Sequence, residues 1–266
     1  KVPADPDGFI TPGSVAQALG SPTRLVALQH SSNVLGAIHD IGAVGSLCRA
    51  HGVTLLVDAA QTAGNCPLPM ESLGIDLLAM PGHKGLQGPQ GTGVLIVGPR
   101  VELAPLRLGG TGSQSEEEWQ PTQYPDRLEA GSHNALGLSG LLAAVEWVER
   151  RGVDSIRRHE EKLLHHFLTG LAALEKKLPL RVLGPRDAAR KSPVVAVTSP
   201  ALKPAAFAAR LWDQHRIMVR PGLHCAPGAH YHAGSFPDGA ARFSFGPFTE
   251  IAHLDRALAA IERILG

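Results

Sequence analysis

Short apolar runs rich in β-branched residues or leucine recur along the first part of the chain, each with a length typical of a buried strand. These runs are residues 25–28, 54–57, 77–80 and 94–97. Between the first two runs, residues 38–51 have helical spacing and end at His51-Gly52. A strand, a helix and a second strand in this order predict a βαβ unit and a parallel sheet with right-handed crossovers.

The second part of the chain has a different pattern. Apolar residues recur at helical intervals over residues 136–151 and 153–177, which predicts a long helical connector. The segments that follow predict strands at residues 180–183, 194–198, 217–220 and 241–245, a helix at 204–215, and a terminal helix capped by Thr249. We therefore expect two domains, residues 1–138 and 139–266, the second of which is a smaller α+β unit. The polar segment 114–126, which contains proline, predicts a surface loop within the first domain.

Composition narrows the classes of function. The 266 residues are 44% hydrophobic, which is enough to bury a substantial core. Lys and Arg total 25 against 24 Asp and Glu, so electrostatics do not favour nucleic acid or an anionic membrane as partners. No secretory signal or membrane-spanning run is recognisable, and three scattered cysteines favour a reducing compartment, so we expect a soluble cytoplasmic protein.

Two segments suggest a cofactor site. Asp58 follows a predicted buried strand, where open α/β sheets usually bind ligands, although an aspartate there could equally cap a helix. Lys84 follows the next predicted strand, among glycines that favour a Schiff-base lysine over a surface turn, and Gly85 after it excludes a Walker loop. An aspartate that keeps a pyridine nitrogen protonated and a lysine that carries the aldehyde carbon are the minimum needed for pyridoxal phosphate (PLP).

A third segment contains a candidate nucleophile. Cys225 lies between small residues in a loop rich in Gly, Pro and His, where we expect it to be mobile and partly exposed. Cys48, within an amphipathic helical pattern, is by contrast typical of a buried structural cysteine. The nearby His224, His230 and His232 match no familiar zinc spacing, so we interpret them as solvent-facing rather than as metal ligands.

These segments occur in the order found in one family. Together with Ser32-Asn33-Val34-Leu35-Gly36, they resemble the cysteine desulfurase and selenocysteine lyase group of the class V aminotransferases, and the similarity runs the whole length of the chain. Further matching segments are Gly109-Gly110-Thr111-Gly112-Ser113, Glu129-Ala130-Gly131-Ser132-His133-Asn134 and Ala241-Arg242-Phe243-Ser244-Phe245. The resemblance implies an α/β fold of the PLP-dependent, aspartate aminotransferase-like type, with a mostly parallel sheet in the large domain.

The resemblance also implies a role for each site residue. Lys84 would form the Schiff base with PLP, and Cys225 would accept sulfur from L-cysteine as a persulfide, with alanine as the other product. The remaining cofactor contacts would be Asp58 to the ring nitrogen, Gln61 and Asn33 to the phenolic oxygen, and His83 and Ser132 to the phosphate. The substrate residues would be Arg242, on the carboxylate, and Arg220, in the same pocket.

The same resemblance implies partners. Ser132 would reach the phosphate across a homodimer interface, and an acceptor protein would take the persulfide sulfur, for example in iron–sulfur cluster assembly. L-selenocysteine is an alternative substrate, another class V reaction is an alternative activity, and a non-catalytic scaffold is an alternative of a different class. Members of the family carry an N-terminal segment with a phosphate loop and a ring-stacking imidazole, and neither precedes Lys1.

Overall fold

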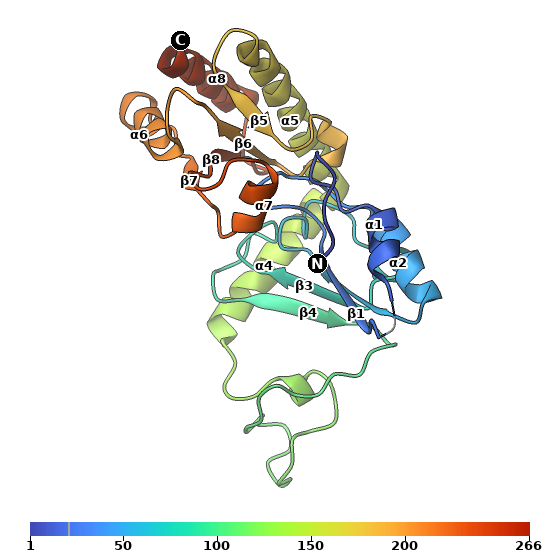
Figure 1. Cartoon of the computed structure of the whole chain (residues 1–266). Coiled ribbons are helices and arrows are strands. Elements are labelled where there is room, and N and C mark those ends of the chain that lie inside the picture. Colours follow the sequence, from blue (N-terminus) through green and yellow to red (C-terminus); the bar gives the residue numbers. More distant parts are fainter. Residues whose placement is uncertain (21) are drawn as a thin grey trace.

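The computed structural model describes residues 1–20 and 22–266. Figure 1 shows two sheets, one above the other, with the long helices α4 and α5 running along their side. The first sheet has the order β1-β2-β3-β4. Its strands are β1 (Leu25–Gln29), β2 (Thr54–Asp58), β3 (Leu77–Pro81) and β4 (Gly93–Val97).

The predicted parallel βαβ arrangement is confirmed for the first three strands. β1 pairs with β2 and β2 with β3 in parallel. The prediction of a parallel strand at residues 94–97 is wrong, because β4 pairs antiparallel with β3. The physical reason is that only residues 82–92 join these two strands, which is too short for the crossover of about a dozen residues or more that parallel strands need.

Three helices accompany the first sheet: α1 (Pro12–Ala18), α2 (Ile41–Ala50) and α3 (Met70–Leu73). Helix α2 begins three residues later than the pattern predicts, because Asp40 accepts a hydrogen bond from the Ala43 N–H and caps it. It packs so closely on α3 that a Cβ at Gly45 would lie 1.9 Å from the Leu73 carbonyl oxygen. Cys48, 1% exposed, lies on its buried face, as predicted.

The connector consists of α4 (Ala135–Arg151) and α5 (Val153–Glu175), separated only by Gly152, whose φ of 81° breaks the helix. The loop that precedes it contains the short 3₁₀ helix Asp126–Leu128 and is otherwise free of regular structure over residues 114–125, which confirms the predicted surface loop. None of the helices in the described part of the chain is both long and apolar enough to cross a membrane.

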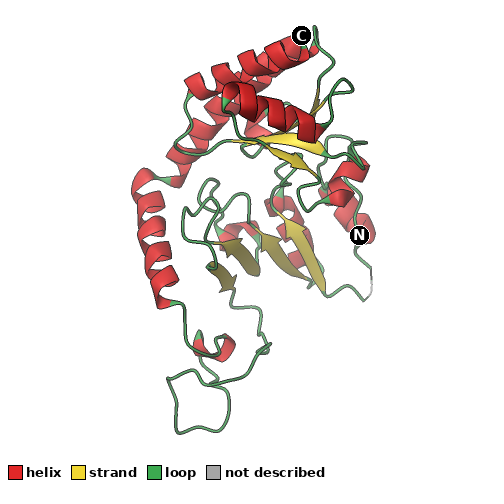
Figure 2. Ribbon diagram, turned by 90° about the vertical axis from the view of Figure 1, so that its left-hand side faces the viewer, coloured by secondary structure: helices red, strands yellow, loops and turns green. Residues whose placement is uncertain are grey.

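The second sheet is antiparallel, with the order β5-β6-β8-β7. Its strands are β5 (Arg181–Leu183), β6 (Val194–Thr198), β7 (Arg220–Gly222) and β8 (Ala240–Ser244), and a 3₁₀ helix (Ala188–Arg190) lies between β5 and β6. The accompanying helices are α6 (Pro204–His215), α7 (Pro227–His232) and α8 (Ile251–Leu265). Phe167, Leu211 and Ile261 are buried from α5, α6 and α8 into one core with Val195 and Phe243 of the sheet. These three helices therefore cover one face of the second sheet (Figure 2).

Two boundaries in this region differ from the prediction. The strand expected at residues 217–220 is paired only from Arg220 onward, where β7 pairs antiparallel with Ala240 to Arg242 of β8. Helix α8 is capped by Glu250, in a capping box with His253, and not by Thr249. The Thr249 hydroxyl instead accepts the Gly246 N–H in the preceding turn. The boundary proposed at residue 138 falls inside α4 and stays a prediction.

The segment of residues 31–38 joins the two sheets. Val34 and Leu35, both buried, pack against Leu183 and Ala196 of the second sheet. Lys191 is fully buried, and its amine donates to the carbonyl oxygens of Leu35 and Leu183. Burial lowers the pKa of Lys191 to about 7. The segment is thereby fixed against the second sheet, and Asn33 within it lies between the two sheets.

Candidate active site

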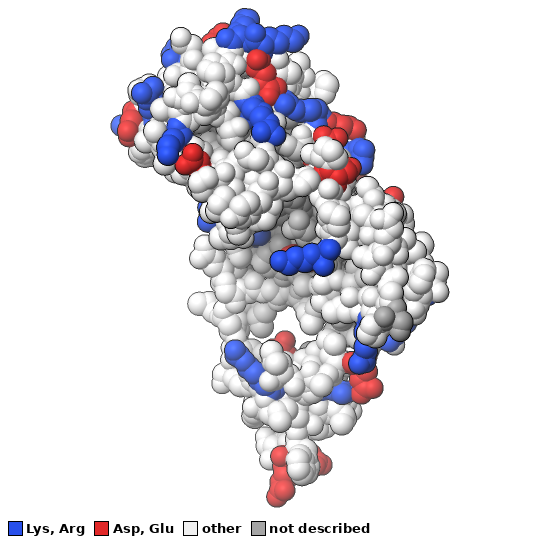
Figure 3. Space-filling view, viewed as in Figure 1, with Lys and Arg blue, Asp and Glu red and all other residues white. Residues whose placement is uncertain are grey.

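A cavity of about 400 Å³ lies between the two sheets, within the size range of small-molecule sites. Figure 3 shows the molecule hollowed at this level, with most charged side chains of this face gathered away from the hollow. Six of the predicted site residues line the cavity: Asn33, Gln61, Lys84, Arg220, Cys225 and Arg242. The structure therefore brings together residues that are widely separated along the chain.

The remaining predicted site residues do not line this cavity. Asp58 ends β2, where it is exposed and accepts the Ala60 N–H through Oδ1 at 2.8 Å. His83 precedes Lys84 and is exposed. Ser132 lies in the exposed segment before α4, outside the cavity. The cofactor roles of these three residues stay predictions.

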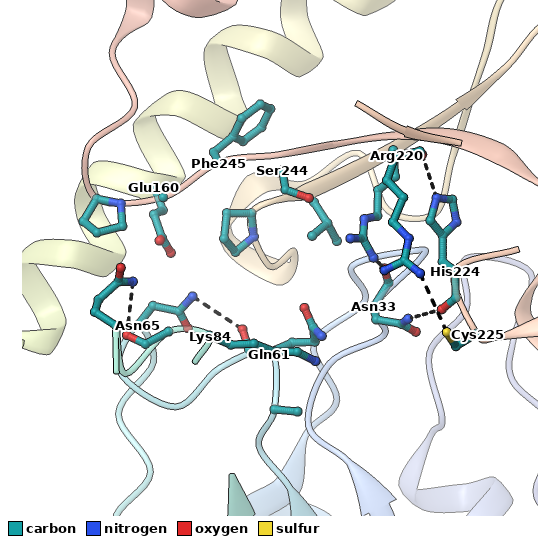
Figure 4. A pocket seen from close by; sticks show the side chains of 18 residues that line it. Asn33, Gln61, Asn65, Lys84, Glu160, Arg220, His224, Cys225, Ser244 and Phe245 are labelled. Atoms are coloured by element: carbon teal, nitrogen blue, oxygen red, sulfur yellow. Dashed lines mark hydrogen bonds between the residues drawn. The ribbon is translucent and has the colours of Figure 1, made fainter. Parts of the chain in front are cut away.

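Lys84 lies in a turn that directly follows β3. The Gly82 N–H donates to the Thr92 carbonyl, and the Gln87 N–H donates to the Lys84 carbonyl, so the backbone is fixed on both sides of the lysine. A Cβ at Gly85 would lie 2.1 Å from the Ala63 carbonyl oxygen, so only glycine allows the turn to pack on the loop after β2. This packing places the lysine beside Gln61 in the cavity (Figure 4).

Cys225 lies at the opposite side of the cavity in Figure 4. It is exposed, as predicted, while Cys48 and Cys66 are buried. Its Sγ lies 3.9 Å from Nη2 of Arg220. His224 and Cys225 both have left-handed backbone conformations, with φ of 53° and 59°, which are unfavourable for residues other than glycine.

The histidines of this loop differ from the interpretation made from sequence. His224 is 4% exposed and His230 is fully buried, so the prediction that they face solvent is wrong, although His232 is exposed. They are buried because they find hydrogen-bond partners inside the loop itself. In residues 1–20 and 22–266, no group of three or more His, Cys, Asp or Glu is placed to hold a metal ion.

Arg242 and Arg220 are paired residues on the adjacent strands β8 and β7. Arg242 donates from Nη1 to the Asn33 carbonyl at 2.8 Å, and its buried Nε has no hydrogen-bond partner among residues 1–20 and 22–266. Burial and the nearby Arg220 lower the pKa of Arg242. No carboxylate forms a salt bridge with either arginine in the described part of the chain. This wall of the cavity is therefore suited to an anion.

Glu160 is a residue of the cavity that the sequence analysis missed. It is 2% exposed. Among the residues that the structure describes, neither its Oε2 nor Oδ1 of the neighbouring Asn65 has a hydrogen-bond partner. Burial raises the pKa of Glu160 to about 8. The sequence could have identified Glu160 by its position on the apolar face of α5, four residues after Ile156 and three before Leu163.

Replacing Glu160 by glutamine is expected to change the pH dependence of stability. Between pH 4.5, its ordinary pKa, and about 8, the folded protein keeps a proton that the unfolded chain releases, so stability falls as pH rises through this window. At about 1.4 kcal/mol for each pH unit, the upper limit of this loss is about 5 kcal/mol. Urea unfolding should show Glu160→Gln more stable than the parent at pH 9 and similar at pH 5. A difference of equal size at both values would contradict the buried neutral carboxyl.

The residues present fit PLP. Lys84 supplies a primary amine in the cavity. Gln61 supplies an amide group beside it, and Asn33 supplies another on the side of Cys225 (Figure 4). Asp58 ends β2, which pairs with β3, the strand that directly precedes Lys84. Asn33 already donates from Nδ2 to the His224 carbonyl at 2.8 Å, and its amide has one further N–H to offer. The positively charged wall at Arg242 would remain for a second, anionic molecule.

Comparison with known proteins agrees with this arrangement. The family Aminotransferase class-V matches residues 1–257. A probable cysteine desulfurase of Pyrococcus abyssi is 36% identical over 246 residues, which cover 91% of this chain and 60% of that protein. A cysteine desulfurase of Escherichia coli O127:H6 is 34% identical over 99% of this chain and 64% of its own length. This chain therefore spans less than two thirds of the length of these relatives.

Solved structures show the same fold. The apo structure of a cysteine desulfurase from Thermococcus onnurineus NA1 superposes with a TM-score of 0.89 at 34% identity and covers 99% of this chain and 65% of that one. The E. coli cysteine desulfurase CsdA, solved as an S-sulfonic acid, superposes with a TM-score of 0.83 at 27% identity, over 96% and 63% of the two chains. The expected fold class, an α/β fold of the PLP-dependent transferase type, is confirmed. The chain belongs to the class V aminotransferase family, whose members depend on PLP.

Proposed function

We propose that the protein is a PLP-dependent cysteine desulfurase, which converts L-cysteine to L-alanine and retains the sulfur on Cys225 as a persulfide. The observation that carries the proposal is one cavity lined by a lysine amine, an exposed thiol and an arginine that has no acidic partner among the described residues. The relatives named cysteine desulfurase support the same reaction.

In this proposal each residue of the cavity has a separate role in the reaction. Bound PLP would supply an electron sink for the substrate's α-carbon. Arg242 would hold the substrate carboxylate, and Lys84 would take up the α-proton and later return a proton to the product. The Cys225 thiolate would attack the substrate sulfur as its bond to carbon breaks, so the cleaved bond's electrons stay with the carbon that becomes the alanine methyl group.

Ser132 supports a homodimer within this proposal. It is exposed, lies in the segment before α4 and is not part of the cavity of its own chain. A partner subunit whose cavity lies against this segment would receive the Ser132 hydroxyl as a phosphate contact. The exposed position of Cys225 would in turn allow an acceptor protein to reach the persulfide, for example for iron–sulfur cluster assembly.

Replacing Cys225 by alanine tests the proposed function. Alanine formation from L-cysteine should fall by at least about 100-fold, while PLP added to the protein still gives its visible absorbance, because the nucleophile and the lysine are separate residues. Cys66→Ala is the matched control, since this thiol is buried and burial raises its pKa to about 11.

Other outcomes identify the alternatives. A Cys225→Ala variant that keeps the parent rate would indicate another class V reaction. Preferred release of selenium from L-selenocysteine would indicate the selenocysteine lyase. Protein that stays colourless with PLP and forms no alanine would support the non-catalytic scaffold and would contradict the proposed enzymatic function.

A further inference from the structure

Three buried or half-buried side chains behind Cys225 form a continuous chain of hydrogen bonds. His224 Nε2 lies 2.8 Å from the Arg220 carbonyl oxygen, and His224 Nδ1 lies 3.3 Å from His230 Nε2. His230 Nδ1 lies 2.8 Å from the Ser235 hydroxyl. We call this chain of contacts the histidine relay. It links the first residue of β7 to the turn after α7, on either side of Cys225.

The contact between His224 and the Arg220 carbonyl determines which atom donates in each of the other hydrogen bonds. A carbonyl oxygen only accepts, so His224 carries its proton on Nε2 and offers Nδ1 as an acceptor. His230 must therefore donate from Nε2, which leaves its Nδ1 to accept from the Ser235 hydroxyl. Both imidazoles are neutral in this arrangement, and burial, which lowers the pKa of each, favours that state.

The relay supports a backbone that is unfavourable by itself. His224 and Cys225 are consecutive residues in the left-handed region, which is unfavourable for residues other than glycine. From the other side, Asn33 Nδ2 donates to the His224 carbonyl at 2.8 Å. The loop is thus fixed from two directions, and this conformation puts Cys225 on the cavity with its Sγ near Arg220.

We propose that His230 and Ser235 are positioning residues for Cys225, which act through His224 to hold the cysteine loop in its strained conformation facing the cavity. The effect of His230 and Ser235 on catalysis rests on the proposed function, whereas their effect on the conformation of the cysteine loop does not. Protonation of His224 on Nδ1 would place two N–H groups against each other, and protonation of His230 on Nδ1 would prevent the Ser235 hydroxyl from donating to it, so either event disturbs the relay. The charged groups that face His224 are Arg220 of β7 and Arg242 of β8, and both oppose a further positive charge. No carboxylate acts on either imidazole in the part of the chain described.

Hydrogen exchange of residues 223–235, corrected for intrinsic rates, tests the relay on the intact protein without cofactor or substrate. In the parent, exchange should be slow at pH 8 and faster at pH 5.5, below the ordinary imidazole pKa of 6.5. His230→Leu should exchange about tenfold faster at both values, because the relay is absent. His230→Gln, which keeps an N–H donor and removes one of the two titrating imidazoles, should be as slow as the parent at pH 8 and should respond less than the parent to acid.

Controls and a second readout keep the test decisive. His232→Leu changes an exposed histidine of the same helix outside the relay and should behave as the parent. Ser235→Ala removes only the last donor, so it remains informative if His230→Leu fails to fold. With L-cysteine as substrate, His230→Leu should lower kcat about tenfold with KM unchanged, and His230→Gln should restore it.

The outcomes separate this inference from the proposed function. Parent-like exchange in His230→Leu, or an unchanged acid response in His230→Gln, would overturn the relay. Normal exchange behaviour in a protein that forms no alanine would leave the relay standing and contradict only the desulfurase.

Discussion

Replacing Lys84 by alanine is expected to abolish both PLP attachment and alanine formation, the latter by at least about 1,000-fold. The backbone around Lys84 is fixed by hydrogen bonds and by the close packing of Gly85 on Ala63, so removal of the side chain should leave the cavity otherwise unchanged. Lys84→Arg should be equally inactive, because a guanidinium keeps the charge but not the nucleophilic amine.

Borohydride reduction after addition of PLP, followed by peptide mapping, checks this directly. The parent should carry the cofactor's mass on the peptide that contains Lys84, and both variants should carry none. Lys191 is the informative competitor, since burial lowers its pKa to about 7. It is fully buried, does not line the cavity, and donates to two carbonyl oxygens, so it should stay unlabelled. A label on Lys191, or on Lys84→Ala protein, would contradict the assigned lysine.

Replacing Arg242 by alanine is expected to raise the KM for L-cysteine by about 100-fold, which corresponds to about 3 kcal/mol. Within the described part of the chain its buried Nε has no hydrogen-bond partner, while Nη1 donates to the Asn33 carbonyl. A carboxylate in the cavity would satisfy this guanidinium and compensate for the cost of its burial. Arg242→Lys should recover only part of the loss, because an ammonium lacks the planar fork.

Steady-state kinetics with varied L-cysteine measure this effect. The increase should be in KM, with a smaller change in kcat, since the contact binds the substrate rather than the reacting sulfur. Arg210→Ala, on the exposed face of α6, is the matched control and should leave KM unchanged. An unchanged KM in Arg242→Ala would place the substrate carboxylate elsewhere in the cavity.

Much of the fold could be predicted from the sequence because local patterns determine it. The strand at 194–198 and the helix at 204–215 have the predicted bounds, since a β-branched run and a helical repeat begun by proline are local signals. The direction of β4 and the extent of β7 were predicted wrongly because they depend on the strand that lies alongside. The strand that will pair with a given segment cannot be identified from the sequence of that segment alone.

The same limit applies to the site. Lys84 and Cys225 stood out by their glycine-, proline- and histidine-rich surroundings, and the structure places both on one cavity. The burial of His224 and His230 was missed because it depends on hydrogen-bond partners that local composition does not reveal. Glu160 was missed because a single charge within an amphipathic helix gives only a weak signal until the opposite wall of the cavity is known.

The buried amine of Lys191 has a consequence for how a substrate enters. Many enzymes admit substrate by swinging two domains apart. Here a hinge motion would pull the Leu35 carbonyl away from Lys191. The fully buried amine would then lose one of its two hydrogen-bond acceptors. The walls of the cavity should therefore move little, and we expect substrate to enter past lining side chains that are already exposed, which include Lys84, Arg220 and Cys225.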